Sequence, residues 1–324
     1  MSGNPINILK NGEVPLRGLQ GKKVSIIGYG NQGKAHAQNL RDSAIDVIIG
    51  ARSPIEAIAD GFTAVSIAQA STADLIIIAL PDELQGELFT SQIEPNLSPN
   101  ATLGFIHGFA IHYGHINPPS GVGVVMVAPK GPGITVREKF LRGKGVLTLM
   151  AVERENASNT ARELALGWAA GIGSARAGVL ESTFKDETET DLFGEQAIIV
   201  GGLTTLIQAS FETLVDAGYP PALAYIECCH EVKQVADIIH ESGIAEMMSA
   251  ISNTAEMGAY EAMTLLDDEQ LRSHLRTLLK NVKDGSFASR LVNKEIENKK
   301  EALRNHEIER IGKEIRSIMQ QDDD

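Results

Sequence analysis

Cysteine and long apolar runs are scarce in this sequence, and each scarcity excludes a class of protein. The chain of 324 residues has two cysteines, the adjacent Cys228 and Cys229. Neighbouring cysteines offer neither a disulfide framework nor the spacing of a zinc site, which favours a reducing cytoplasm. The longest apolar run, residues 75–80, is too short to cross a bilayer, and the first residues lack the pattern of a signal peptide. We therefore expect a cytoplasmic protein with no membrane partner.

Basic charge is also in short supply. Lysine and arginine total 29 against 42 aspartates and glutamates, so the net charge is −13. Nucleic acids and anionic membranes both require a basic patch, so we expect neither as a partner. Hydrophobic residues at 43% and charged residues at 22% are ordinary for a globular protein, and the length favours two domains.

In the first half of the chain, short apolar runs alternate with helical stretches. Near-continuous apolar strands are typical of a parallel sheet that helices cover on both faces. The alternation predicts an α/β fold with a doubly wound parallel sheet. We expect strands at 23–28, 46–49, 74–80, 103–107 and 124–128, and helices at 35–41, 55–59 and 157–170.

Beyond residue 183 the strand signal almost disappears. Residues 191–217 and 221–242 are helical by length and composition, and residues 294–324 are typical of a solvated helix followed by an acidic tail. We therefore predict two domains, an α/β domain over residues 1–182 and an all-α domain over residues 183–324.

A glycine motif follows the first predicted strand. Residues 28–33 spell GxGxxG between the strand KVSIIG and the helix KAHAQNL. In this context the turn brings backbone N–H groups and a helix N-terminus onto a pyrophosphate, as in the Rossmann fold. A tight βα turn without a ligand is the alternative. The motif predicts cofactor contacts from Gly28, Tyr29, Gly30, Asn31, Gln32 and Gly33.

The end of the second strand bears on the choice of cofactor. Arg52 and Ser53 can hold the extra phosphate of NADPH, whereas an acid at this position accepts from the ribose hydroxyls of NADH. Glu56 is such an acid, but Ser53, Pro54 and Glu56 also fit the N-cap, N1 and N3 positions of a helix. The balance leans slightly to NADH, and NADPH stays open.

Four acids in the second half form two pairs. Asp191 and Glu195 are four residues apart, as are Glu227 and Glu231, so each pair shares a helix face. Such pairs arise by chance, but here both continue onto apolar residues, where repulsion and desolvation call for a cation. Oxygen ligands favour Mg²⁺, and four carboxylates can hold two ions. Acids bridged to Lys or Arg are the alternative.

Several longer motifs resemble those of the ketol-acid reductoisomerase family, of its short class. They occur in family order between residues 23 and 258, and TETDLFGEQ is the most specific. Besides the glycine-rich segment, they are HGF at 107–109, PKGPG at 129–133, TFKDETETDLFGEQ at 183–196, ECCHE at 227–231 and SNTAE at 252–256.

The resemblance implies a Rossmann domain followed by a helical domain that intertwines with a partner's, in a homodimer or a higher oligomer. The site would be shared between subunits. It implies 2-acetolactate or 2-aceto-2-hydroxybutyrate as the 2-hydroxy-keto acid substrate, in valine, isoleucine and leucine biosynthesis. A Mg²⁺-dependent alkyl migration would precede reduction by NADH or NADPH to the 2,3-dihydroxy acid. Paired metals suit this chemistry because charge develops on two adjacent oxygens.

The same resemblance assigns roles to particular residues. Asp191, Glu195, Glu227 and Glu231 would bind two Mg²⁺ ions, the last two from the partner subunit, and Glu195 or Glu231 would also move protons. Ser252 would bind the substrate carboxylate. The catalytic residues would include His107 and Lys130, which follow strands, and Pro81 and Gly133 are further predicted cofactor contacts.

The sequence departs from the family at a few places. The opening residues lack the usual family pattern, the loop after the second strand is short, and Met248 and Met257 replace common Arg and Tyr residues. After Gly258 the resemblance fades. Two rival functions stay open: a metal-free β-hydroxyacid dehydrogenase that uses a catalytic lysine, and a non-catalytic nicotinamide-binding regulator.

Overall fold

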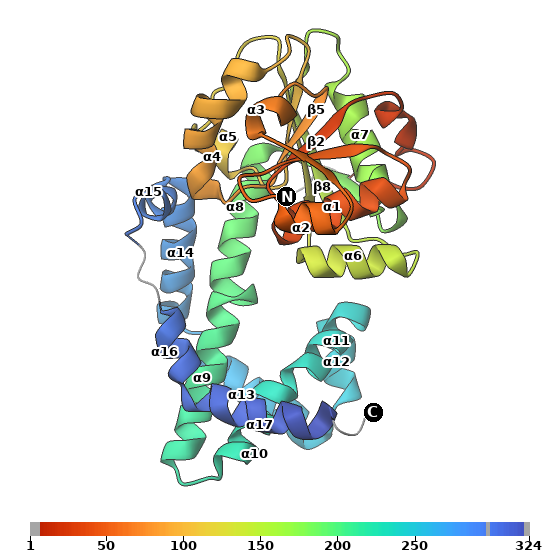
Figure 1. Cartoon of the computed structure of the whole chain (residues 1–324). Coiled ribbons are helices and arrows are strands. Elements are labelled where there is room, and N and C mark those ends of the chain that lie inside the picture. The colour runs from red at the N-terminus through yellow and green to blue at the C-terminus, as the bar shows by residue number, and fades with distance from the viewer. Residues whose placement is uncertain (1–6, 296–298, 321–324) are drawn as a thin grey trace. The chain divides into compact units, whose positions relative to one another are not determined.

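The structure, a computed structural model, describes residues 7–295 and 299–320 (Figure 1). The chain divides into two compact units, unit 1 (Met1–Thr190) and unit 2 (Asp191–Asp324). The end of the expected acidic tail, residues 321–324, lies outside the described residues. The domain boundary expected between residues 182 and 183 stays a prediction.

Unit 1 is built on one nine-stranded sheet with the strand order β1-β9-β8-β7-β6-β5-β2-β3-β4. From β4 to β7 every neighbouring pair is parallel, whereas β7 pairs with β8, and β1 with β9, in antiparallel orientation. The strands are β1 (Ile8–Leu9), β2 (Val24–Ile27), β3 (Val47–Gly50), β4 (Thr63–Val65), β5 (Leu75–Ile78), β6 (Thr102–Phe105), β7 (Gly123–Pro129), β8 (Thr148–Arg154) and β9 (Val179–Glu181).

All five predicted strands are present, as β2, β3, β5, β6 and β7. The predicted fold class is therefore confirmed, with the correction that the sheet is mixed rather than wholly parallel. The four strands that the apolar pattern did not predict are β1, β4, β8 and β9. Three of them have only two or three residues, and β8 is only partly apolar, so neither kind gives a long apolar run.

Helices cover both faces of the sheet (Figure 1). Residues of α1 and α7 pack with β2 and β5 on one face, where Trp168 is fully buried. Residues of α3, α4 and α5 pack on the other face around Phe105. The helical segments of unit 1 are η1 (Leu16–Leu19), α1 (Asn31–Asp42), α2 (Ile55–Ala59), α3 (Ile67–Ala70), α4 (Asp82–Leu88), η2 (Phe89–Ile93), η3 (Glu94–Asn96), α5 (Phe109–His112), α6 (Gly133–Leu141), α7 (Ala161–Gly171) and η4 (Ser174–Arg176).

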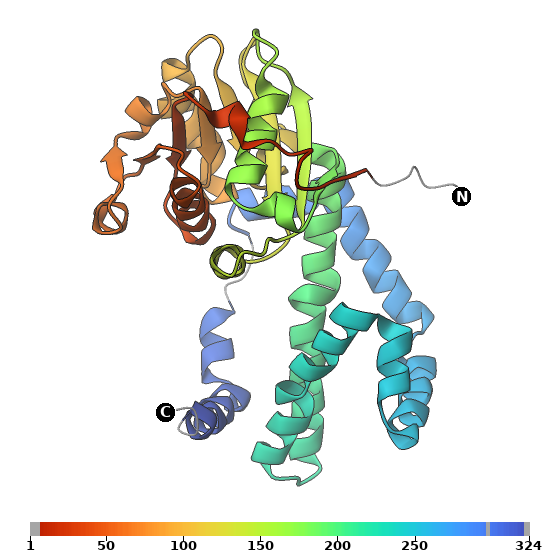
Figure 2. The ribbon, with the colours of Figure 1, turned by 90° about the vertical axis from the view of Figure 1, so that its right-hand side faces the viewer.

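The N-terminal turn η1 lies against α7, as Figure 2 shows. A Cβ at Gly18 would come within 2.2 Å of the Glu163 carbonyl oxygen, and one at Gly167 within 3.0 Å of the Leu19 amide. Glycines at both positions therefore allow this close packing, which seals the core on the α7 face.

Unit 2 is helical throughout its described residues, as predicted. Helix α8 begins in unit 1 and ends in unit 2. The buried core of unit 2 is small and centres on Phe211 and Tyr225. The segments are α8 (Phe184–Gly194), η5 (Glu195–Ile199), α9 (Gly201–Asp216), α10 (Pro221–Tyr225), η6 (Ile226–His230), α11 (Val232–Ser242), α12 (Ile244–Ala250), α13 (Asn253–Leu266), α14 (Glu269–Lys283), α15 (Ser286–Val292), α16 (Lys300–Asn305) and α17 (Glu307–Gln320).

Many large apolar side chains of unit 2 are exposed within the single chain. Ile199 is 64% exposed and Leu265 is 77% exposed. The continuous helix Phe184–Asp216 spans 33 residues and contains a window of mean hydropathy 1.5, which meets the length and composition of a membrane span. Length and composition alone are weak evidence for a span, because a helix covered by protein passes the same test. This surface therefore needs a cover of some kind.

Candidate active site

A cavity of 560 Å³ lies at the carboxyl ends of the parallel strands of unit 1. It runs from the glycine-rich turn after β2, past the end of β3, to the residues that follow β5 and β6. The carboxyl edge of such a sheet, where the strand order reverses, is where α/β proteins bind ligands. Its lining includes Gly28 to Gln32, Gly50 to Ser53, Ile78 to Asp82, Gln85, Ile106 and His107.

The glycine-rich turn has the conformation that its motif requires. Gly28 has φ +101°, and a Cβ there would lie 2.5 Å from the Ala79 carbonyl oxygen, so this position needs glycine. Gly33 packs on the turn itself, because its Cβ would lie 2.3 Å from the Gly28 carbonyl oxygen. Helix α1 begins at Asn31, and this first residue lines the cavity. The turn is therefore shaped for a pyrophosphate.

The predicted cofactor contacts fall into two groups. Eight of them line the cavity, namely Gly28, Tyr29, Gly30, Asn31, Gln32, Arg52, Ser53 and Pro81. Gly33 and Gly133 instead support the turn from behind, since a Cβ at Gly133 would lie 2.1 Å from the Asn31 carbonyl oxygen. The Gln32 amide also donates to the Gly131 carbonyl at 2.9 Å, which joins the turn to the start of α6.

The capping box considered for the second βα loop does not form. Helix α2 begins after Pro54, which is its N-cap, and no side chain caps it. The alternative in which Glu56 serves only in a capping box with Ser53 is therefore wrong. Arg52 and Ser53 both line the cavity, which leaves their donors available to a ligand.

The strongest cluster of polar side chains centres on Glu187, which the sequence reasoning did not single out. Glu187 lies on α8 with its side chain 1% exposed. The Lys130 ammonium donates to its Oε1 at 2.7 Å, and the Gly108 N–H donates to its Oε2 at 3.0 Å. His107 Nδ1 lies 3.1 Å from Oε1 and 3.0 Å from Oε2. The predicted catalytic residues His107 and Lys130 thus meet on one buried carboxylate.

The charge state of Glu187 follows from these contacts. Burial alone would raise the pKa of Glu187, but the hydrogen bond and charge of His107 and the charge of Lys130 lower it to about 2. The carboxylate is therefore ionised at neutral pH and favours the charged forms of its two partners.

Gly108 allows α8 to approach this edge of the sheet. A Cβ at Gly108 would lie 2.4 Å from Thr188 Oγ1 and 2.8 Å from the Phe184 carbonyl oxygen. A second contact joins the same segments, because His112 Nε2 lies 3.4 Å from Glu189 Oε1. His112 thus helps to hold α8 in place.

Helix α8 also carries the first predicted metal ligand. Asp191 follows Glu187 by one helical turn, and with His107 these residues offer three ligand atoms that lie within 4.8 Å of one another. Glu187, Asp191 and Glu195 are spaced four residues apart in the sequence, but the predicted helix began at residue 191 and so left Glu187 out.

The predicted acids of unit 2 lie beside two π-helical turns. Glu195 begins η5, and its carbonyl accepts from the Val200 N–H at 3.0 Å. Glu227 lies in η6, and the Glu231 N–H donates to the Ile226 carbonyl at 3.1 Å. Such turns insert one residue into a helix and are frequent at functional sites. Both acid pairs therefore stand where the helix is not regular, a feature that the spacing argument did not predict.

Within the described residues of unit 2, the four predicted metal ligands do not come together in a single chain. Asp191, Glu195, Glu227 and Glu231 form no group of three in which the ligand atoms all lie within 4.8 Å of one another. Ser252, the predicted substrate ligand, is the N-cap of α13, and its hydroxyl accepts from the Ala255 N–H at 3.2 Å. The roles of these residues stay predictions.

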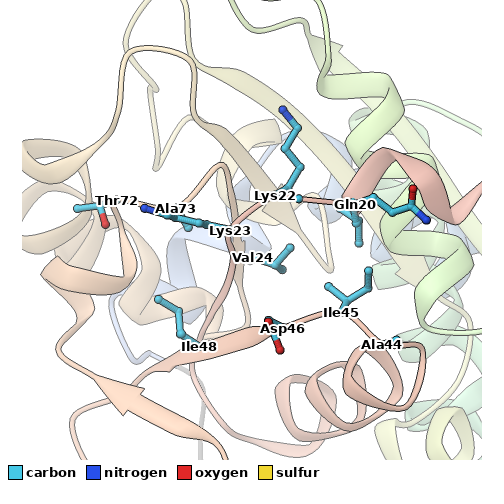
Figure 3. A pocket seen from close by; sticks show the side chains of 12 residues that line it. Gln20, Lys22, Lys23, Val24, Ala44, Ile45, Asp46, Ile48, Thr72 and Ala73 are labelled. Atoms are coloured by element: carbon cyan, nitrogen blue, oxygen red, sulfur yellow. The ribbon is translucent and has the colours of Figure 1, made fainter.

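Another cavity, of 580 Å³, lies at the opposite edge of the sheet (Figure 3). It surrounds the amino ends of β2 and β3, with Lys22, Lys23 and Asp46 among the residues that line it. Figure 3 shows these side chains pointing in different directions. None of its 12 lining residues is a predicted site residue, so volume alone does not identify the active site.

Comparisons with known proteins match two successive segments of the chain. Residues 18–178 match the family model described as "Acetohydroxy acid isomeroreductase, NADPH-binding domain", and residues 184–321 match "Ketol-acid reductoisomerase, C-terminal domain". A solved NADH-preferring ketol-acid reductoisomerase from an uncultured archean is 39% identical, with a TM-score of 0.92. That match covers 96% of this chain and 98% of that one.

Two more distant structures share the fold alone. A semialdehyde dehydrogenase NAD-binding protein from Cupriavidus necator is 19% identical with a TM-score of 0.62, over 81% of this chain and 99% of that one. An oxidoreductase of unassigned reaction from Jannaschia sp. is 14% identical with a TM-score of 0.59, over 81% of this chain and 97% of that one.

Proposed function

Because the chain belongs to the ketol-acid reductoisomerase family, it is an NAD(P)H-dependent oxidoreductase and isomerase, and we propose how its own residues carry the reaction. The substrate is 2-acetolactate or 2-aceto-2-hydroxybutyrate, and the product is the 2,3-dihydroxy acid of valine, isoleucine and leucine biosynthesis. The observation that carries the proposal is the Glu187 cluster beside the cofactor cavity, where His107 and Lys130 share one buried carboxylate.

The donor set on α8 fits magnesium. Glu187 and Asp191 offer carboxylate oxygens one turn apart, and Glu195 follows at the start of the π turn. Oxygen donors without a cysteine cluster are what Mg²⁺ prefers. We propose that Asp191, Glu195, Glu227 and Glu231 hold two ions. When bound, the ions would stabilise negative charge on two adjacent substrate oxygens, and the reduced nicotinamide would supply the hydride.

The residues around Glu187 position and move charge. Lys130, whose ammonium is held at 2.7 Å by Glu187, stays protonated and lies where negative charge develops on the substrate. Glu187 also orients the imidazole of His107 through Nδ1, which fixes the direction of Nε2. Glu195 and Glu231 accept and return the substrate proton at their carboxylates, and Ser252 binds the substrate carboxylate.

We propose NADH as the preferred cofactor, with NADPH as the alternative. The 39% identical relative is NADH-preferring. The turn Gly28–Gly33 holds the pyrophosphate, while Arg52 and Ser53 face the adenosine end of the cavity. Glu56 in the first turn of α2 adds negative charge near that end, which disfavours a second phosphate.

The exposed apolar surface of unit 2 is best covered by a second copy of this chain. The helix that carries Asp191 and Glu195 continues directly into Ile198, Ile199 and Val200, which are all more than half exposed. A homodimer would bury these side chains and also supply Glu227 and Glu231 to the site of its partner. This arrangement accounts for the apolar helix without a membrane, and we place the protein in the cytoplasm.

An acetolactate assay tests the reaction, the metal and the cofactor together. NADH and NADPH are supplied in parallel, each with Mg²⁺ or with EDTA, and consumption of the reduced cofactor is followed. We expect turnover only with Mg²⁺, and faster turnover with NADH. Full activity on a hydroxy acid in EDTA would favour a metal-free β-hydroxyacid dehydrogenase. Cofactor binding without turnover would favour a regulator.

A further inference from the structure

Asp60, at the C-terminal end of α2, gathers donors from two neighbouring segments. Its Oδ2 accepts from the Tyr29 hydroxyl at 2.8 Å, the Lys34 ammonium at 2.9 Å and the Gln38 amide at 3.3 Å. The Arg41 guanidinium donates to the Asp60 carbonyl oxygen at 2.6 Å. A single residue thus receives hydrogen bonds from the glycine-rich turn and from α1.

The donors on α1 lie on one face of the helix. Lys34, Gln38 and Arg41 follow one another at spacings of four and three residues, which places them one above the other along α1. This face is therefore turned to the end of α2.

Asp60 lies at the C-terminal end of α2, where a carboxylate is least favourable. It is the C-cap residue, and the helix dipole disfavours negative charge at a C-terminus. The cations of Lys34 and Arg41 offset that cost. The contact to α1 therefore accounts for an acid at this position, which the helix itself does not favour.

Tyr29 connects this contact to the cofactor cavity. It is the second residue of the turn Gly28–Gly33 and lines the cavity. Its ring packs edge-on against Phe62 with the ring centroids 5.8 Å apart, and its hydroxyl is fixed by Asp60. The guanidinium of Arg41 lies over the ring of Phe62, 4.4 Å from its centroid. Both the ring and the hydroxyl of Tyr29 are thereby held.

The protonation states agree with this geometry. Hydrogen bonds from Lys34 and then Tyr29 lower the pKa of Asp60, so its carboxylate is charged at neutral pH. Burial, followed by the hydrogen bond to Asp60, raises the pKa of the Tyr29 hydroxyl, which therefore keeps its proton and donates. The hydrogen bond to Asp60 raises the pKa of Lys34 as well.

Helix α2 directly follows Arg52 and Ser53, the other wall of the cavity at its adenosine end. We propose that Asp60 is a positioning residue for the nicotinamide cofactor, which joins the pyrophosphate-binding turn to the helix behind the adenosine-binding loop. It acts through Tyr29 and α2 and makes no contact with the reacting atoms. The inference rests on the proposed function only in that the cavity binds a nicotinamide dinucleotide.

The test measures cofactor affinity in the full-length protein without substrate. Asp60→Asn keeps the shape of the side chain but removes its charge, so Lys34 and Tyr29 lose their charged acceptor. We expect the Kd for NADH, from a fluorescence titration, to rise about tenfold, the effect of losing one charge-assisted contact. Asp42→Asn is the matched control: the Asp42 carboxylate, on α1, is likewise ion-paired, with Arg137 at 2.7 Å, but Arg137 neither belongs to the turn Gly28–Gly33 nor lines the cavity.

A second variant isolates the turn from the helix pair. Tyr29→Phe keeps the ring against Phe62 and removes the hydroxyl, and we expect the Kd for NADH to rise about threefold, as for one hydrogen bond. In the Tyr29→Phe, Asp60→Asn double variant the two effects should be less than additive, because both remove the same contact. In turnover by Asp60→Asn, KM for NADH should rise while kcat stays within about twofold, because Asp60 does not line the cavity.

The outcomes separate this inference from the proposed function. Asp60→Asn that binds NADH as tightly as wild type, or no more weakly than Asp42→Asn, would overturn the inference even if acetolactate is turned over. A lower melting temperature in Asp60→Asn with unchanged NADH affinity would assign Asp60 a structural role only, and also overturns it. Wild-type protein that binds neither NADH nor NADPH would contradict both proposals.

Discussion

The two units differ in how completely they bury their apolar residues. Unit 1 closes two cores, one on each face of the sheet, and side chains such as Trp168 and Phe105 are fully covered. Among the described residues of unit 2, the core around Phe211 is small, while Ile199 and Leu265 stay mostly exposed. A sheet with helices on both faces is complete within one chain, whereas the helices of unit 2 leave an apolar surface that requires a cover.

The same difference separates the two halves of the chemistry. The cofactor cavity and the Glu187 cluster are formed by residues of unit 1, which hold one another by short hydrogen bonds. Among the residues that the structure describes, Glu227 and Glu231 of unit 2 belong to no group of three close ligand residues in the single chain. Unit 1 therefore forms its part of the site within one chain, and we infer that unit 2 contributes Glu227 and Glu231 to the site of a partner chain.

Mixed dimers test this inference with the largest expected effect. Lys130→Met in unit 1 and Glu227→Gln in unit 2 should each reduce kcat by a factor on the order of 1,000. A purified heterodimer with one change in each chain should regain about half of the wild-type activity, because one of its two shared sites is intact. Co-expression with two affinity tags isolates this heterodimer for the assay.

The reciprocal heterodimer is the control. When both changes lie in one chain and the partner is wild type, each shared site contains one change and no activity is expected. If one chain supplied a whole site, the outcomes would be exchanged: the first heterodimer would be inactive and the reciprocal one half active. That exchange would refute the sharing of sites.

A smaller effect is expected from a single charge on the apolar surface of unit 2. Ile199→Lys places an ammonium where we propose that the partner packs, and it should raise the dimer dissociation constant by about 100-fold or more. Mass by light scattering, measured over a dilution series, reports this directly. Leu141→Lys in unit 1 is the control, because Leu141 has the same exposure of 64%. Equal masses for the two variants at every dilution would contradict the proposed interface.

Sequence reasoning succeeded where burial leaves a simple pattern. The strand at residues 75–78 is apolar throughout because helices cover both its faces, and that alone predicted it. β8 escaped prediction because its charged end, Glu153 and Arg154, breaks the apolar run. The antiparallel pairing of β7 with β8 joins segments that are separated in the sequence, and the local residue pattern does not encode such pairing.

The candidate site was predictable to the extent that its chemistry is local. The turn Gly28–Gly33 and the two acid pairs, Asp191 with Glu195 and Glu227 with Glu231, are each defined within a few residues. Glu187 was missed because its role comes from His107, Gly108 and Lys130, which approach it only through the fold. The π turns were missed for another reason: one inserted residue changes hydrogen bonding without changing composition.

The smallest predicted effect concerns pH and returns to the closed core of unit 1. His36 on α1 is fully buried, and the Trp168 indole donates to its Nδ1 at 3.1 Å. Its Nε2 therefore carries the ring proton, and it has no hydrogen-bond partner in the structure. Burial lowers the pKa of His36 from 6.5 to about 3. The neutral ring is thus the form that the fold accepts.

The sign of the pH dependence follows from this lowered pKa. His36 binds a proton near pH 6.5 in the unfolded chain and only near pH 3 in the folded chain. The contribution of neutral His36 to the free energy of unfolding is therefore fully present above pH 6.5 and is lost as the pH falls toward 3. Linkage between these two values gives a loss of about 2 kcal/mol from pH 7 to pH 5. Urea unfolding of wild type and His36→Asn at both values measures it. His240→Asn in unit 2 is the control, and the dependence should persist there, because that histidine is exposed. His36→Asn should lose this part of the dependence; if it keeps the whole of it, the acid sensitivity arises outside the unit 1 core.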